Sequence, residues 1–262
     1  MAKKLKTSDR VVFGEYISYQ DKNKNSEFEP LEWQVLDCVG SKALLLSFHA
    51  LDFTKPSNLK WQNSPIRRWL NEEFLQQAFT EEEQDLIFFS KIESNDDYSK
   101  FLHSIPDDAH NYEIYDQLFL LSIKDVNLYL SSYDNESFEQ DPLRQSTVTS
   151  YARMKGAFVF ALSQYERGRR QYRVYGHLYP VCGKTIWGLR DKYCIDHFGH
   201  IISCPDQGYA IKPAMWVDLS KCSLIREAEY YYQSDRVTLA KKDGAPYRVH
   251  EDIPNNSDEL PF

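Results

Sequence analysis

The order of the apolar runs along this chain is the feature that most limits its fold. Short runs with partial alternation of apolar and polar residues occupy positions 11–13, 31–36 and 42–47, and such runs are typical of β-strands. Between positions 64 and 90 the apolar residues have the spacing that is typical of helices, and strand-like runs return after Trp187. A change from strands to helices and back to strands predicts an α+β fold.

Capping signals place the start of several helices. Ser64 followed by Pro65 combines an N-cap with a proline in the first turn, which predicts a helix from this point. Thr80 and Glu83 have the spacing of a capping box, so a second helix is expected after Thr80.

The second half of the chain gives further elements. A buried strand is expected over positions 119–122, where Ser122 would also cap a helix that carries Asp125 at its third position. Positions 146–160 are expected to form another helix. Strands are expected over 193–196, 200–203 and 214–217.

Composition excludes some classes of protein. Hydrophobic residues make up 42% and aromatic residues 15% of the chain, which is enough for a packed core. The net charge of −8 repels phosphate, so direct nucleic-acid binding is not favoured, although a local basic patch could still provide it. We see neither a secretory signal nor an apolar run of about 20 residues, so we expect a cytoplasmic protein with no membrane association.

A succession of motifs gives a more specific indication. The first are Phe13-Gly14-Glu15-Tyr16, Leu31-Glu32-Trp33-Gln34-Val35-Leu36 and Trp61-x-x-Ser64-x-Ile66-Arg67-x-Trp69-Leu70-Asn71. They are followed by Asp116-x-x-Phe119-Leu120-Leu121-Ser122, Thr149-x-Tyr151-Ala152-x-x-x-Gly156-Ala157, Trp187-x-Leu189-Arg190 and Lys212-Pro213-Ala214-Met215-Trp216.

Over residues 9–219 these motifs resemble a bacterial family of unknown function with a C-type-lectin-like fold. The resemblance implies a twisted antiparallel sheet with flanking helices over these residues. Residues 1–8 are expected to be an N-terminal extension. The pattern decays beyond about Ser220, so residues 220–262 are expected to form a flexible, acidic-ended tail. The same superfamily includes formylglycine-generating enzymes and the variable proteins of diversity-generating retroelements. A shared fold does not transfer function.

The chain departs from the family pattern at Lys212, where the family usually has arginine. An ammonium cannot present the planar fork of a guanidinium, so a bidentate role would be lost at this position. We expect the tryptophans of the motifs to be core anchors, and Arg67 and Arg190 to bond carboxylates or loop carbonyls.

A basic and aromatic stretch is the first candidate binding segment. Residues 164–175 interleave four arginines with three tyrosines, a mixture that suits phosphates, stacked bases or an acidic protein surface. The alternative is a solvated surface, which charge runs usually form. The candidate ligand-binding residues are Arg167, Arg169, Arg170, Tyr172, Arg173 and Arg190.

Five cysteines raise the question of a metal or redox site. We expect thiols with structural roles in a reducing cytoplasm. Zinc could use Cys194, His197, His200 and Cys204, but two strands around a turn would spread these side chains over both faces of a hairpin. An oxidase like the formylglycine-generating enzymes would use Cys182, Cys194 and Cys204, whose spacing does not match that enzyme's motif.

The tail is the second candidate binding segment. The residues Asp258, Glu259, Leu260, Pro261 and Phe262 resemble the acidic tip of bacterial single-stranded-DNA-binding proteins, which recruits partners in DNA replication and repair. A phenylalanine ring can fill an apolar pocket while the acidic residues follow a basic rim.

We therefore predict a recognition module for an unknown protein or small ligand, with no cofactor and no catalytic residues. An adaptor that docks through the tip and a metal-dependent oxidase are the alternatives.

Overall fold

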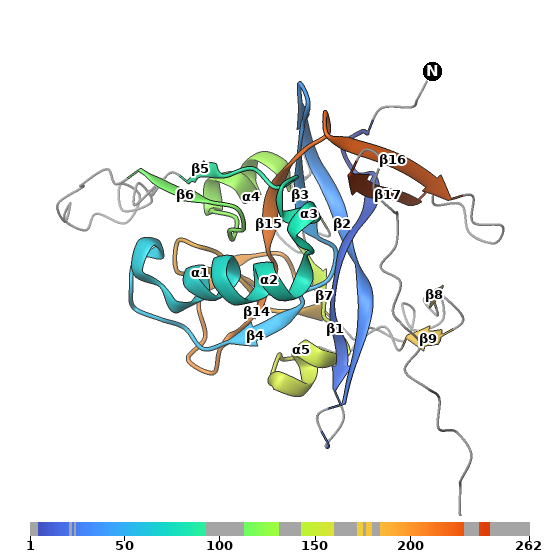
Figure 1. The fold of residues 1–262 in the computed structure, drawn as a ribbon. Helices are drawn as coiled ribbons and strands as arrows, with labels where there is room; N and C mark the ends of the chain where they lie inside the picture. Colours follow the sequence, from blue (N-terminus) through green and yellow to red (C-terminus); the bar gives the residue numbers. More distant parts are fainter. Residues whose placement is uncertain are drawn as a thin grey trace, which may run out of the picture.

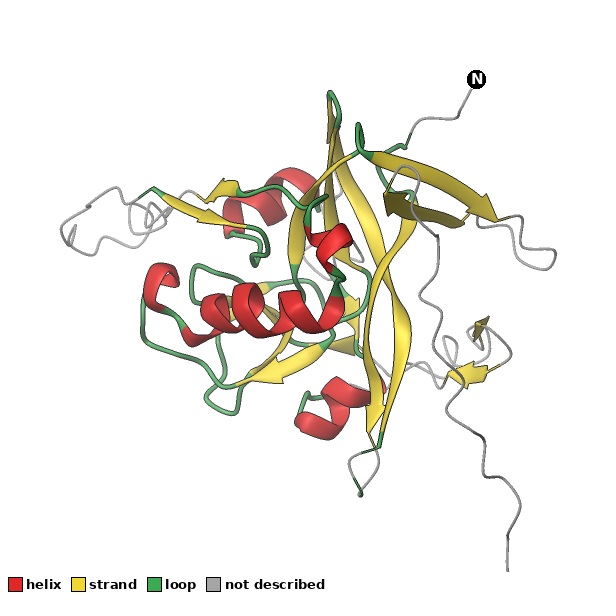
Figure 2. Cartoon of the chain, in the orientation of Figure 1, coloured by secondary structure: helices red, strands yellow, loops and turns green. Residues whose placement is uncertain are grey.

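Strands form most of the elements in this protein, whose computed structural model describes residues 5–20, 23, 25–92, 113–130, 143–159, 172–174, 177–179, 184–227 and 236–241. Short helices lie on one side of the long β1–β2 hairpin (Figures 1 and 2). The predicted α+β class is confirmed. None of the described helices has the length and apolar character needed to cross a membrane.

The larger sheet has six strands and curves into a half-barrel. Its order is β15-β3-β2-β1-β17-β16, and each pair is antiparallel except β1 with β17. The strands are β1 (Arg10–Gln20), β2 (Ser26–Val39), β3 (Lys42–Ser47), β15 (Ala214–Asp218), β16 (Cys222–Glu227) and β17 (Arg236–Lys241). The three strands expected from positions 11–13, 31–36 and 42–47 are confirmed.

Two strands of this sheet lie beyond residue 219, within the segment expected to be a flexible tail. Strand β17 pairs with β1 through Val11 and Val237, and β16 pairs with β17 along its whole length. The paired backbone groups of β1 thus gain partners that a sheet edge would lack. Residues 222–227 and 236–241 therefore belong to the sheet.

The second sheet has five strands in the order β13-β12-β11-β14-β4. They are β4 (Asp52–Thr54), β11 (Trp187–Gly188), β12 (Tyr193–Ile195), β13 (Ile201–Ser203) and β14 (Tyr209–Ile211). Strands β12, β13 and β15 agree closely with the predicted 193–196, 200–203 and 214–217.

The two sheets are joined where two chain segments cross between them side by side. Strand β3 continues into β4 while β14 continues into β15, and both pairs are antiparallel. Ser47 N donates to Pro213 O at 2.9 Å, and Leu51 N donates to Ile211 O at 2.8 Å. These bonds make the segment at Lys212 and Pro213 the joint between the sheets.

The first group of helices follows the predicted caps. It comprises η1 (Trp61–Asn63), α1 (Pro65–Trp69), η2 (Leu70–Phe74, a π turn), α2 (Leu75–Ala78) and α3 (Glu81–Gln84). Ser64 Oγ accepts from Arg67 N at 3.2 Å, and Thr80 and Glu83 form a complete capping box. Both predicted caps are confirmed.

A close approach of α2 to β1 explains the glycine of the first motif. Gly14 has φ +71° at a bulge in β1, and a Cβ there would lie 2.6 Å from Ala78 O. A side chain would both strain the backbone and push the helix away.

Two predictions for the middle of the chain are wrong in part. Phe119 forms only an isolated bridge to Ala214, so positions 119–122 are not a strand, although Ser122 and Asp125 do cap α4 (Ile123–Tyr129). The helix expected over 146–160 is limited to α5 (Ser150–Lys155), because Thr149 caps its start and Gly156, at φ +124°, ends it.

The other described strands form three pairs. They are β5 (Ser90–Ile92) with β6 (Ile114–Asp116), β7 (Ser146–Thr147) with β10 (Lys184–Thr185), and β8 (Tyr172–Val174) with β9 (His177–Tyr179). The β5–β6 pair extends from the main body beside α4 (Figure 1).

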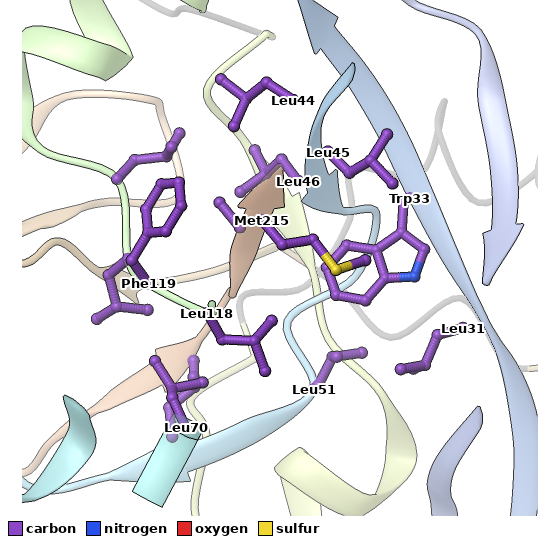
Figure 3. Packing of buried hydrophobic residues seen from close by; sticks show 14 of the residues in the cluster. Leu31, Trp33, Leu44, Leu45, Leu46, Leu51, Leu70, Leu118, Phe119 and Met215 are labelled. Atoms are coloured by element: carbon purple, nitrogen blue, oxygen red, sulfur yellow. The ribbon is translucent and has the colours of Figure 1, made fainter. Parts of the chain in front are cut away.

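The core lies between the six-stranded sheet and the helices. Figure 3 shows the leucines of β3 and Met215 of β15 gathered with Trp33, Leu70 and Leu118, all of them buried. Trp33 also satisfies its only polar group, because Nε1 donates to Phe13 O at 2.7 Å. The predicted motifs thus supply both the packing and its polar connections.

Candidate functional site

The first arginine of the motifs belongs to a closed polar network. Arg67 donates through Nε to both oxygens of Asp116, at 2.8 and 3.0 Å, and its Nη2 lies 2.8 Å from Oδ1. Trp61 Nε1 donates to Oδ2 at 2.9 Å, and the Asp116 side chain is only 2% exposed. A buried carboxylate needs such partners, so this arginine braces the fold.

Asn71 holds the same region from the helix side. Its Nδ2 donates to Leu118 O at 2.8 Å, and its Oδ1 accepts from the backbone N of Gln117 and Leu118 at 2.9 and 3.1 Å. One side chain therefore satisfies three backbone groups of a segment 46 or 47 residues away, which explains its place in the motif.

Lys212, the departure from the family pattern, is buried at the joint between the sheets. Its Nζ donates to Phe48 O and to Ser146 Oγ, each at 3.2 Å, and lies 5.4 Å from the centre of the Trp187 ring. No carboxylate pairs with it among the described residues. This side chain connects the two crossing segments, which is a structural role.

Burial strongly perturbs two groups at this joint. Desolvation lowers the pKa of Lys212 to about 7. Desolvation also lowers the pKa of His49 to about 3, with smaller contributions from Lys212 and Arg10. His49 Nδ1 lies 2.6 Å from Thr147 Oγ1, so the neutral ring keeps a polar partner.

The second arginine of the motifs lines a cleft. Arg190 follows β11, and its backbone N donates to Leu121 O at 3.0 Å, which fixes its place beside α4. The cleft has a volume of about 150 Å³ and is lined by residues of β5, α4 and β15 together with Phe119 and Arg190. Its lining includes Lys91, Phe119, Lys124, Asp125, Arg190 and Trp216.

Charge in this cleft is mainly positive. Three of the lining side chains carry positive charge and only Asp125 carries negative charge. Asp125 Oδ2 accepts from Arg190 Nη1 at 2.6 Å and from Ser122 N at 2.8 Å. Lys91 pairs with Glu113 at the outer edge of the β5–β6 pair.

The guanidinium of Arg190 is not fully used by its neighbours. Its side chain is only 7% exposed, and Nη1 also donates to Leu120 O at 2.9 Å. Nε is buried, and no described residue accepts a hydrogen bond from it. A buried donor without an acceptor costs free energy, and this donor belongs to a side chain that lines the cleft.

The cysteines that sequence analysis singled out are close together in one pair. Cys194 Sγ lies 2.7 Å from Cys204 Sγ, and both are free thiols. Cys182 lies outside the described residues. Among the described residues, no three His, Cys, Asp or Glu side chains are grouped to hold a metal ion.

Most of the predicted binding residues cannot be placed. Arg167, Arg169 and Arg170 lie outside the described residues, as do the side chains of Tyr172 and Arg173 in β8. The tip from Asp258 to Phe262 also lies outside them. Arg190 is the one predicted ligand-binding residue whose side chain is described.

Sequence analysis missed the other residues of the cleft. Lys91, Lys124 and Trp216 come from β5, α4 and β15, which are distant in the chain. Trp216 had a motif to mark it, but the two lysines lie in no motif. These residues come close to Arg190 only because the elements pack together. The spacing of residues along the sequence therefore does not predict it.

These features define a mixed α+β domain with a braced scaffold and a cationic cleft lined by described residues. Residues 41–219 match a family model described as a domain of unknown function, DUF6273, so the chain belongs to that family. No curated protein and no solved structure shows significant similarity to it. The family match covers the cleft, Arg67 and Arg190.

Proposed function

We propose that this protein is a non-enzymatic recognition module, and that it binds an acidic side chain of a protein partner in the cleft around Arg190. The observation that carries the proposal is the partly unused guanidinium beside two lysines. A carboxylate is planar and accepts two hydrogen bonds, which suits a guanidinium better than any neutral group does.

The size of the cleft favours a single side chain over a larger ligand. The cleft has a volume of about 150 Å³. Pockets for drug-sized molecules are larger, at about 300–1,000 Å³. Trp216, partly buried at the cleft, offers an aromatic surface to the methylene groups of a glutamate.

Titration with N-acetylglutamate amide tests the proposal, and N-acetylglutamine amide is the neutral control of the same shape. We expect the glutamate compound to shift the Trp216 indole N–H resonance with a Kd of about 1 mM, as suits one side chain. The glutamine compound should cause no saturable shift.

Matched lysine variants then locate the interaction. K91Q combined with K124Q should weaken binding at least about tenfold, because each removes a cation from the cleft. K55Q changes an exposed lysine that does not line the cleft and should bind normally. Equal binding by both variants would overturn the proposal.

We further propose that residues 9–219 adopt a C-type-lectin-like arrangement. The ordered succession of motifs supports this assignment, and the mixed sheet and short helices are compatible with it. An experimental structure compared with known C-type lectins tests it. Failure to superpose the six-stranded sheet and its flanking helices would contradict it.

A docking tip is the second candidate function, and the match of residues 258–262 to the acidic Pro-Phe tip favours it. Pull-down from a bacterial lysate would compare the full chain with a chain that ends at Asn256 and with P261A. We expect only the full chain to capture proteins of DNA replication or repair. Capture of the same proteins by all three would exclude this function.

A further inference from the structure

Two thiols face each other across the edge of the five-stranded sheet. Strands β12 and β13 are antiparallel, with Tyr193 opposite Ser203 and Cys194 opposite Ile202. Cys204 directly follows β13, so it is a diagonal neighbour of Cys194, a position from which side chains can meet. The Sγ atoms are 2.7 Å apart, with Cys194 as the donor.

The two thiols differ in exposure and in acidity. Cys194 is fully buried, whereas Cys204 is partly exposed. The hydrogen bond from Cys194 lowers the pKa of Cys204, and burial raises the pKa of Cys194. Because Cys204 is partly exposed and Cys194 is not, Cys204 is the sulfur that a solute can reach, and its thiolate is the reactive form.

We propose that Cys194 and Cys204 are a thiol–disulfide modification site that hydroperoxides oxidise. The Cys204 thiolate attacks the peroxide oxygen, the O–O bond breaks, and hydroxide leaves, which takes a proton to become water. Cys194 sulfur then attacks the sulfenic sulfur of Cys204. The S–S bond forms, the S–O bond breaks, and the departing hydroxyl leaves as water with the Cys194 proton.

In total, two thiols and one hydrogen peroxide give one disulfide and two waters, so the peroxide is reduced as the sulfurs are oxidised. The other described cysteines are not arranged for this reaction. Cys38 is exposed, and its Sγ lies 3.7 Å from Leu5 O, while Cys222 Sγ lies 3.1 Å from Asp218 O. The disulfide would join edge strand β13 to its neighbour β12.

Treatment of the full, reduced chain with hydrogen peroxide tests the proposal. The chain has five cysteines, and we expect the thiols that iodoacetamide alkylates after denaturation to fall by two, from five to three. Dithiothreitol should restore them. The intact mass of the oxidised chain should fall by the mass of two hydrogen atoms.

Cleavage before aspartate identifies the pair, because Asp196 lies between the two cysteines in the sequence. Peptide 191–195 should remain joined to peptide 196–205 until reduction. C204S should abolish the joined peptides, whereas C38S and C182S should leave them unchanged. A disulfide that needs Cys38 or Cys182, or survival of both thiols at peroxide concentrations that oxidise Cys38, would overturn the proposal.

Discussion

Two arginine–aspartate pairs in this protein have the same chemistry but opposite burial. In the first pair the acid is buried, since Asp116 is 2% exposed and Arg67 is 30% exposed. In the second pair the base is buried, since Arg190 is 7% exposed and Asp125 is 24% exposed. Burial thus falls on the acceptor in one pair and on the donor in the other.

The difference shows how scaffold and site can be distinguished within one set of motifs. The buried carboxylate of Asp116 has three donor groups, two from Arg67 and one from Trp61. The buried guanidinium of Arg190 has five N–H groups to satisfy, and Nε has no acceptor among the described residues. A closed network serves the fold, whereas the donor left without an acceptor beside the cleft is the feature on which the proposed ligand site rests.

The same substitution at each arginine measures this difference, and the larger effect is expected at Arg67. R67M leaves the Asp116 carboxylate buried with only Trp61 as a donor, so unfolding should cost about 3 kcal/mol less than in the parent chain. Urea denaturation at pH 7 measures this change. The comparison fails if R67M is no more destabilised than R190M.

Lys212 extends the comparison to a buried cation with no carboxylate partner among the described residues. Its pKa is about 7 in the folded chain against 10.5 for an ordinary lysine. Below pH 7 the Lys212 amine is protonated in both the folded and the unfolded chain, so the full cost of burying its charge lowers the stability of the fold. Between pH 7 and 10.5 the amine is protonated only in the unfolded chain, so the free energy of unfolding rises with pH.

The expected gain for the parent chain between pH 7 and 8.5 is about 2 kcal/mol, at ~1.36 kcal/mol per pH unit. K212M removes the titrating group and should flatten this part of the profile. K221M changes an exposed lysine and should keep the slope of the parent chain. Parallel profiles for the parent chain and K212M would show that Lys212 is not the cause.

Local signals made much of the fold predictable. The caps at Ser64, Thr80 and Ser122 depend on a few neighbouring residues, and all three are present. Helix length was less predictable, because the apolar spacing over positions 146–160 continues past Gly156, where the backbone turns. The strands beyond residue 219 were missed because pairing with β1, a long-range contact, decides their state.

The candidate site was predictable only through its arginine. Arg190 lies in a motif, but its environment comes from three other elements, and no pattern in the sequence brings Lys91 or Lys124 to it. Lys212 also lies in a motif, but there the sequence directed attention to a ligand contact. The lysine in place of the family's arginine suggested that this contact is weakened. In the structure, Lys212 instead donates hydrogen bonds to Phe48 O and Ser146 Oγ and so holds the joint between the sheets.

R190M provides the smallest expected change in stability and separates the two kinds of pair most clearly. The apolar side chain replaces a buried guanidinium, and Asp125 keeps its bonds from Ser122 N and Oγ, each at 2.8 Å. The lost bond to Leu120 O costs about 1 kcal/mol in the free energy of unfolding, partly offset because Nε is no longer buried without an acceptor.

Binding should change far more than folding in this variant. The shift of the Trp216 indole resonance by N-acetylglutamate amide should disappear in R190M while the urea midpoint stays close to that of the parent chain. The reverse outcome, normal binding with a loss of stability as large as that of R67M, would place Arg190 in the scaffold. Ligand binding would then have to depend on the lysines of the cleft alone. The Arg67–Asp116 and Arg190–Asp125 pairs would no longer differ in role.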